Sequence, residues 1–144
     1  MQKTTHGTAA ASAFSARFQA TATPLDFVNP NTINGNATFR VDWGDGIWIE
    51  YVAGGDAIAV ASGTITVEAD SGFSHIKFAS DTFTAIDLQK CDTLTTANAM
   101  CQGLTNLTSF AANDTSNITD FKRAWHNCSS LTSFPLIDTS GGIL

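Results

Sequence analysis

The chain has 144 residues, of which 43% are apolar and 14% are charged, and its formal net charge is −6. This length allows one ordinary domain or two small modules with a packed core. The seven Lys and Arg residues are scattered along an acidic chain, which excludes a basic stripe for nucleic acid. No run approaches the roughly 18 apolar residues of a membrane-spanning helix. We therefore expect neither nucleic acid binding nor membrane insertion.

Residues 1–23 are rich in Ala, Thr and Ser, with only Phe14 and Phe18 as large apolar anchors. This composition predicts an N-terminal arm that cannot form a core of its own. Two interpretations stay open: a flexible terminus, or a segment that orders when it docks on a partner subunit. The arm also lacks the continuous apolar run of a signal peptide, so we expect no export by that route.

Residues 24–82 change to short runs in which apolar and polar residues alternate, the pattern of β-strands. Strands are expected at 25–29, 38–43, 48–52, 64–69 and 75–78, with "NPNTINGN" and "AGGDAIAVASG" as connections. Phe39 and Val41 alternate with Arg40 and Asp42, and "TITVEA" alternates in the same way. One buried and one solvated face is typical of antiparallel sheets. The segment therefore predicts a small antiparallel β-sandwich.

The stretch "VDWGDG" places Asp42 and Asp45 among glycines at the expected tip of a hairpin. Two carboxylates can share acid and base duties only if burial separates their pKa values, and the alternation puts Asp42 on the solvated face. A calcium site would need six to eight oxygen ligands, and only Asp26, Asp42, Asp45 and Asp56 are nearby in the sequence. We interpret both aspartates as turn residues that bond nearby backbone N–H groups.

The third part, 83–144, contains a repeat of 24 residues, since "LTSF" occurs at 107–110 and again at 131–134. Apolar residues follow the spacing i, i+3, i+4, i+7 in both copies, which predicts one face of a helix. These residues are Ala97, Met100, Cys101 and Leu104 in one copy, and Phe121, Ala124, Trp125 and Cys128 in the next. Each unit is expected to form a short strand, a turn around "DTS" and a helix. In the second copy this helix is expected over 117–128. Stacked units of this kind form a leucine-rich-repeat solenoid, here with an incomplete third repeat.

The repeat "FKRAWHNCSSLTSFPLIDTSGG" resembles the BspA-like leucine-rich repeats of bacterial surface proteins. The "VDWGDG" segment and the β-rich stretch after it are similar to the PKD-like sandwich that often precedes such repeats. The fold class expected is mainly β with short helices, a small antiparallel sandwich followed by a short solenoid. The resemblance implies extracellular recognition without enzymatic activity.

Such modules occur in bacterial adhesins and in phage tail and fibre proteins. We expect a non-enzymatic virion protein, because the sequence lacks an export signal and an anchor and contains free thiols and an Ala/Thr-rich arm. Such a protein would assemble with other virion subunits through the arm and attach to the host surface. A homo-oligomer and a host glycan or protein ligand are expected. The alternative is a fragment of a bacterial cell-surface adhesin. A more distant alternative is an accessory binding region of a carbohydrate-active enzyme.

The recognition surface expected is a ladder of outward side chains on the repeat strands: Thr84, Thr108, Ser109, Thr132 and Ser133. Hydroxyl groups at a regular spacing can bond sugars or peptide edges weakly at many points. The competing interpretation is a solvated, β-favouring residue without a ligand. We expect no catalytic residues, metal ligands or cofactor, because the histidines are dispersed and Cys91, Cys101 and Cys128 follow no zinc spacing. The three cysteines are expected to be reduced and mostly buried.

Overall fold

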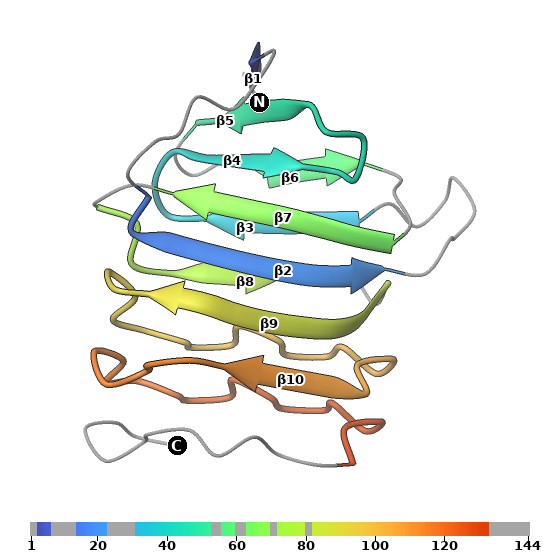
Figure 1. Ribbon diagram of the computed structural model, residues 1–144. Coiled ribbons are helices and arrows are strands. Elements are labelled where there is room, and N and C mark those ends of the chain that lie inside the picture. Colours follow the sequence, from blue (N-terminus) through green and yellow to red (C-terminus); the bar gives the residue numbers. More distant parts are fainter. Residues whose placement is uncertain are drawn as a thin grey trace.

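The computed structural model describes residues 3–6, 14–22, 31–52, 56–59, 63–69, 72–79 and 82–132. These residues are mainly β, as expected, and form ten strands (Figure 1). The strands are β1 (Lys3–His6), β2 (Ala16–Ala22), β3 (Asn31–Gly35), β4 (Phe39–Asp42), β5 (Trp48–Tyr51), β6 (Asp56–Ala59), β7 (Gly63–Ala69), β8 (Ile76–Phe78), β9 (Phe83–Cys91) and β10 (Ser109–Ala112).

The strands form two sheets. The larger has seven strands in the order β1-β5-β4-β7-β2-β9-β10, and the smaller has the order β6-β3-β8. The small sheet lies behind one face of the large one in Figure 1, and apolar residues of both sheets share one buried core. All strand pairs are antiparallel except β9 with β10, which run parallel.

The strands predicted from alternation are confirmed at β4, β5, β7 and β8. Phe39 and Val41 are buried, as expected for one face of β4, and Ile65 and Val67 are buried on β7. The predicted strand at 25–29 lies outside the described residues. Two segments predicted as connections contain strands instead, β3 and β6. Ile33 is buried on β3 and Ala57 on β6, but Gly35 next to Ile33 on the same face of β3 and the alanines of β6 are small, so the alternation of these strands is weak in the sequence.

The prediction of an N-terminal arm over 1–23 is wrong for β2. This strand lies inside the large sheet, between β7 and β9, and pairs with both along its whole length. Three of its four inward side chains are alanines, and Ala16, Phe18, Ala20 and Ala22 are each at most 3% exposed. Alanine fills the narrow space between the sheets, so the strand needs few large apolar residues to be held in the core.

The repeat units stack on one another with the 24-residue offset of the sequence. Ser109 of β10 pairs with Ala85 of β9, and Thr96 pairs with Asp120 in an isolated parallel bridge. The strands β9 and β10 therefore extend the large sheet. On the other side, Phe78 N of β8 donates to Met100 O at 2.8 Å, so the return segment of the repeat continues the small sheet. Figure 1 shows β9 and β10 each followed by a winding return segment behind the large sheet.

The predicted helix over 117–128 is wrong, and the described residues contain no helix. The return segments are built from four-residue turns, each closed by a hydrogen bond from the fourth amide to the first carbonyl, as in Met100 N to Ala97 O at 3.1 Å. In four of these turns the third residue has positive φ: Ala99, Gly103, Arg123 and Asn127, at 55°, 79°, 56° and 62°. This left-handed geometry is typical of type II turns and interrupts a helix.

Hydrogen bonds between the coils replace those of a helix. Ala97 N donates to Asp120 O at 2.7 Å, and Cys101 N donates to Ala124 O at 2.8 Å. Tandem four-residue turns also place the residues at i, i+3, i+4 and i+7 on one side, so the predicted apolar stripe does face the core. Trp125 is half-buried and stacks on Phe121 at 5.9 Å between ring centroids, which agrees with a core role. None of the described residues belongs to a helix that could cross a membrane.

Candidate functional site

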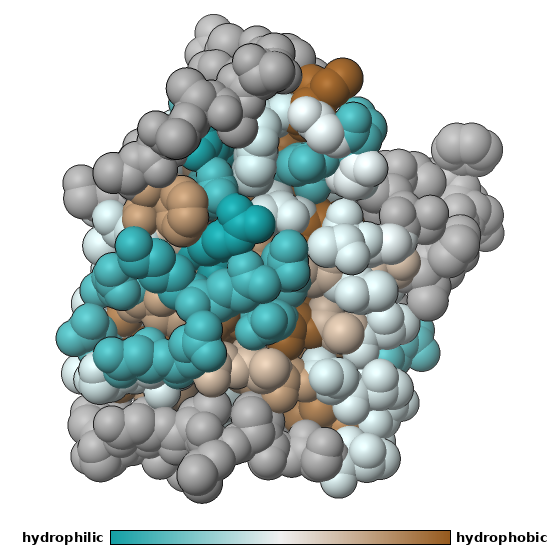
Figure 2. All heavy atoms as spheres, in the orientation of Figure 1, coloured by the Kyte–Doolittle hydropathy of each residue, from teal (hydrophilic) through white to brown (hydrophobic). Residues whose placement is uncertain are grey.

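The outer face of the large sheet is the side turned away from the small sheet, and its side chains align in rows across the strands. The ionic row consists of Glu50, Arg40, Glu68, Arg17 and Gln89. The hydroxyl row consists of Thr64, Thr21, Ala85 and Ser109. Between them lie Thr66, Gln19, Asp87 and Ala111. Figure 2 shows hydrophilic side chains gathered on one half of this face and paler, weakly polar residues on the other.

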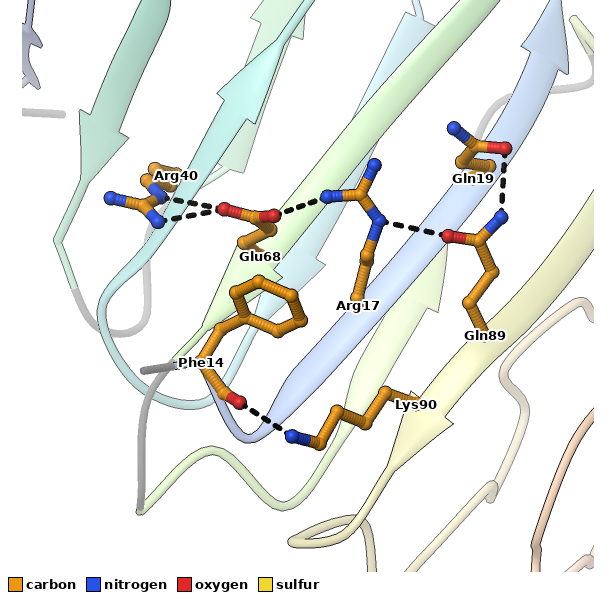
Figure 3. Close-up of polar contacts among 7 residues, drawn as sticks. All are labelled: Phe14, Arg17, Gln19, Arg40, Glu68, Gln89 and Lys90. Atoms are coloured by element: carbon orange, nitrogen blue, oxygen red, sulfur yellow. Dashed lines mark hydrogen bonds and ion pairs between the residues drawn. The ribbon is translucent and has the colours of Figure 1, made fainter. Parts of the chain in front are cut away.

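Glu68 is the centre of the ionic row. Arg40 Nη2 donates to Glu68 Oε1 at 2.7 Å, and Arg17 Nη1 donates to Glu68 Oε2 from the other side (Figure 3). The Glu68 side chain is only 5% exposed, and both of its oxygens are engaged by charged donors. A buried carboxylate needs such partners because its desolvation is otherwise costly. The ionic row is therefore a closed structural network.

Amides and aromatic rings complete this network. Arg17 Nε donates to Gln89 Oε1 at 2.8 Å, and Gln89 Nε2 donates to Gln19 Oε1 at 2.9 Å. The Phe14 ring lies 5.7 Å from the Arg17 guanidinium and 5.3 Å from the Lys90 ammonium. Lys90 Nζ also donates to the Phe14 carbonyl at 3.1 Å (Figure 3). The cations on this half of the outer face are thus occupied by protein groups.

Of the predicted ladder residues, Ser109 lies in the hydroxyl row and Thr84 and Thr108 are next to the row in sequence, with both threonine hydroxyls used inside the fold. Thr84 Oγ1 donates to Thr21 O at 3.2 Å, and Thr108 Oγ1 donates to Thr84 O at 3.1 Å. These bonds join β2, β9 and the chain leading into β10. Ser109 and Thr132 are exposed. Ser133 lies outside the described residues, so the ladder as a recognition surface stays a prediction.

A hollow of about 300 Å³ lies on the outer face where β7, β2, β9 and β10 meet. Its polar lining is Gln19, Thr21, Thr64, Asp87 and Ser109. Ala85 and Ala111 line it as well, and their small side chains leave the space between longer neighbours. Of the four predicted site residues that the structure describes, only Ser109 lines the hollow. Gln19, Thr21, Thr64 and Asp87 were missed, because their proximity depends on the pairing of β2 between β7 and β9.

The "VDWGDG" aspartates hold the loop between β4 and β5, which confirms their interpretation as turn residues. Asp42 Oδ1 accepts from Gly44 N at 2.8 Å and from Gly46 N at 3.0 Å. Asp45 Oδ1 accepts from Ile47 N at 3.0 Å. Positive φ at both glycines, 105° and 80°, lets the amides turn toward the carboxylate.

Replacing Asp42 by Ala is expected to lower the free energy of unfolding by about 1.5 kcal/mol, because two backbone donors lose a charged acceptor. Asp45→Ala is the matched control with one lost bond, and we expect about 0.5 kcal/mol for it. Urea unfolding followed by tryptophan fluorescence measures both. Equal losses in the two variants would show that Asp42 has no special role in the loop.

Other titratable groups are dispersed. His126 is exposed, and His75 Nε2 lies 2.9 Å from the carbonyl oxygen of Asn98. Within the described ranges, no three His, Cys, Asp or Glu side chains gather as metal ligands would. Cys91, Cys101 and Cys128 form no disulfide with one another, and the first two are buried. The Cys128 thiol donates to the carbonyl oxygen of Cys101 at 3.0 Å.

Burial controls the protonation of the inner thiols. It raises the pKa of Cys91 to about 12, and the charges of Asp92, Asp114 and Asp87 add to the shift. Burial also raises the pKa of Cys101 well above its ordinary value, with Cys128 adding to the effect. The pKa of Tyr51 is raised by burial and lowered to a smaller extent by the hydrogen bond from Trp43 Nε1.

We expect the protein to lose stability as the pH rises from about 9 toward 12. The unfolded thiols release protons near pH 9, whereas the folded thiols keep them, so Cys91, with its pKa raised to about 12, costs about 1.4 kcal/mol per pH unit in this window. Cys101 acts in the same direction. Below pH 9 these groups contribute no pH dependence. Urea unfolding at pH 7.5 and pH 10 measures the loss. Cys91→Ala should reduce it by about 1.4 kcal/mol, and an unchanged loss in that variant would contradict the assignment to this thiol.

Comparison with known proteins gives no relative for this chain: no protein-family model, no curated protein and no solved structure matches it.

Proposed function

We propose that the chain is a non-enzymatic structural and recognition protein of a phage virion, a tail or fibre component that attaches to a host surface. Its fold in this proposal is a PKD-like β-sandwich followed by a leucine-rich-type solenoid whose coils return through tandem turns. Other virion subunits and further copies of the chain are the proposed assembly partners.

The observation that carries the proposal is the in-register stacking of the repeat. The 24-residue units add strands to the large sheet and turn segments to the small sheet, with hydrogen bonds between equivalent positions. Stacking of this kind extends one solvent-facing surface without a break, which suits weak contacts repeated along a surface. The charged side chains of the ionic row bond to one another within the protein. The hydroxyl row and the hollow are therefore the polar part of this surface that a ligand can reach.

The site chemistry also favours binding over catalysis. The aspartates of the conspicuous "VDWGDG" motif are engaged by backbone amides, and the buried Glu68 is engaged by two arginines. These three carboxylates serve structural hydrogen bonds, so neither the motif nor the ionic row points to acid-base catalysis.

Localisation in particles tests the proposal directly. Antibodies raised against the purified chain, carrying gold label, are applied to particles released from lysed cultures that express the chain. We expect label on tails or fibres in electron micrographs, and labelled chain that adheres to host cells. Label confined to bacterial envelopes would instead support the cell-surface adhesin. Absence of the chain from purified particles would overturn the virion assignment.

A further inference from the structure

We propose that the hollow on the outer face binds a neutral saccharide. This inference rests on the proposed function, because it names the ligand class that the recognition surface would take. The hollow is polar and open, and it is made by four strands that are distant in the sequence. Its volume of about 300 Å³ lies at the lower end of small-molecule sites and suits a terminal sugar residue.

The donors and acceptors around the hollow match vicinal hydroxyl groups. Asp87 presents a carboxylate, which accepts hydrogen bonds from adjacent O–H groups. Gln19 has its amide oxygen engaged by Gln89 Nε2 at 2.9 Å, so the group that it offers a ligand is its N–H₂ donor. The hydroxyls of Thr64 and Ser109 can donate or accept. A sugar ring, whose hydroxyls also do both, satisfies this mixed set.

The charge of the residues around the hollow favours a neutral sugar. Among the described residues that line the hollow, Asp87 is the only ionisable one and none is a cation. The arginines of the outer face are committed to Glu68 in the ionic row. The chain as a whole has a formal net charge of −6. An anionic polymer such as a teichoic acid would approach a site of like charge, so binding of phosphate or carboxylate sugars is disfavoured.

The rigidity of the lining supports a preformed site. The lining side chains stand on paired strands, and Asp87 lies opposite Gln19 on β2 and Ala111 on β10. Gln89 connects Gln19 to Arg17 and thereby to the ionic row. A side chain fixed in this way loses little rotamer freedom on binding. A single shallow site is still weak, and firm attachment would come from many copies on one particle.

Saturation-transfer difference NMR tests the inference, because it detects weak binding to intact polysaccharides. The probes are neutral lipopolysaccharide O-chains, neutral capsular polysaccharides and, as the anionic counterpart, a polyglycerol-phosphate teichoic acid. We expect saturation transfer to at least one neutral polysaccharide and none to the teichoic acid. Transfer to the teichoic acid alone, or to no probe, would overturn the proposal.

Variants locate the site. Ala111→Gln fills the hollow from an exposed position on β10 and should reduce binding at least about tenfold. Ala79→Gln is its matched control at an exposed alanine after β8 and should bind normally. Asp87→Asn should weaken binding about tenfold, whereas Asp92→Asn, at an exposed aspartate outside the lining, should not. Ser109→Gln provides a second filling variant if Ala111→Gln does not fold.

The outcomes separate this inference from the proposed function. A chain that is found in virions but binds neutral saccharides equally well after Ala111→Gln leaves the function standing and removes the site. A chain that is absent from virions but loses neutral saccharide binding on Ala111→Gln overturns the proposed function and leaves the site standing.

Discussion

Replacing Gly35 by Ala is expected to destabilise the fold by about 3 kcal/mol, because the added methyl group has no room. An added Cβ would lie 2.5 Å from Phe73 Cε2 and 2.9 Å from Phe39 Cδ1. Both rings are fully buried and contact each other at 5.9 Å between centroids. Relieving the clash therefore requires movement in the aromatic centre of the core, where close packing leaves little room.

Gly63→Ala is the matched control. Gly63 has a positive φ of 86°, but an added Cβ would meet no atom within 4 Å. Its cost is backbone strain alone, about 1 kcal/mol. Urea unfolding of the two variants should give a difference of about 2 kcal/mol. Equal losses would show that the contact between β3 and the aromatic rings is looser than described.

Replacing Glu68 by Gln is expected to cost about 2 to 3 kcal/mol. The change removes the charge between Arg17 and Arg40, and breaking a fully buried pair costs about 3 to 5 kcal/mol. The arginine side chains are 31% and 21% exposed, so water compensates part of the loss. Chemical unfolding at neutral pH measures the effect.

A double-mutant cycle separates the charge pair from packing. In the Arg40→Met background, Glu68→Gln should cost about 1 kcal/mol less than in the natural chain. Asp92→Asn is the surface control, because its pair with Lys90 spans 3.6 Å between side chains that are 63% and 43% exposed. It should change stability by less than about 0.5 kcal/mol. A cost for Glu68→Gln as small as that of the control would show that the ionic row adds nothing to the fold.

The strands with large alternating residues could be predicted from the sequence. In β4 and β7, Phe39, Val41, Ile65 and Val67 mark the buried face without ambiguity. β2 was missed because alanine at three of its four inward positions resembles low-complexity sequence. Its burial depends on pairing with β7 and β9, which no local pattern reveals.

The return segments show a limit of periodicity itself. The spacing i, i+3, i+4, i+7 fits one helix face, and it fits tandem four-residue turns equally well. One signal in the sequence distinguishes them: Gly103 and Asn127 occupy equivalent positions 24 residues apart, and both residue types favour left-handed geometry. This pair of residues favours turns over a helix.

Part of the candidate site could be predicted in the same way. Ser109 was expected next to the threonine ladder of the repeat strands, as part of the recognition surface, and it lines the hollow. The opposite wall comes from Gln19 and Thr64 on strands β2 and β7. That wall exists because the repeat continues the sheet that contains β2, a non-local arrangement.

The stacking of 24-residue coils underlies both the outer face and the hollow, and hydrogen-bond scalar couplings in NMR spectra test it most directly. We predict couplings from the amide nitrogen of Ala97 to the carbonyl carbon of Asp120, and from that of Cys101 to that of Ala124, across bonds of 2.7 and 2.8 Å. A helix over 117–128 would instead couple the amide nitrogen of Ala124 to the carbonyl carbon of Asp120. Observation of that helical coupling, without the two couplings between coils, would contradict the stacked arrangement.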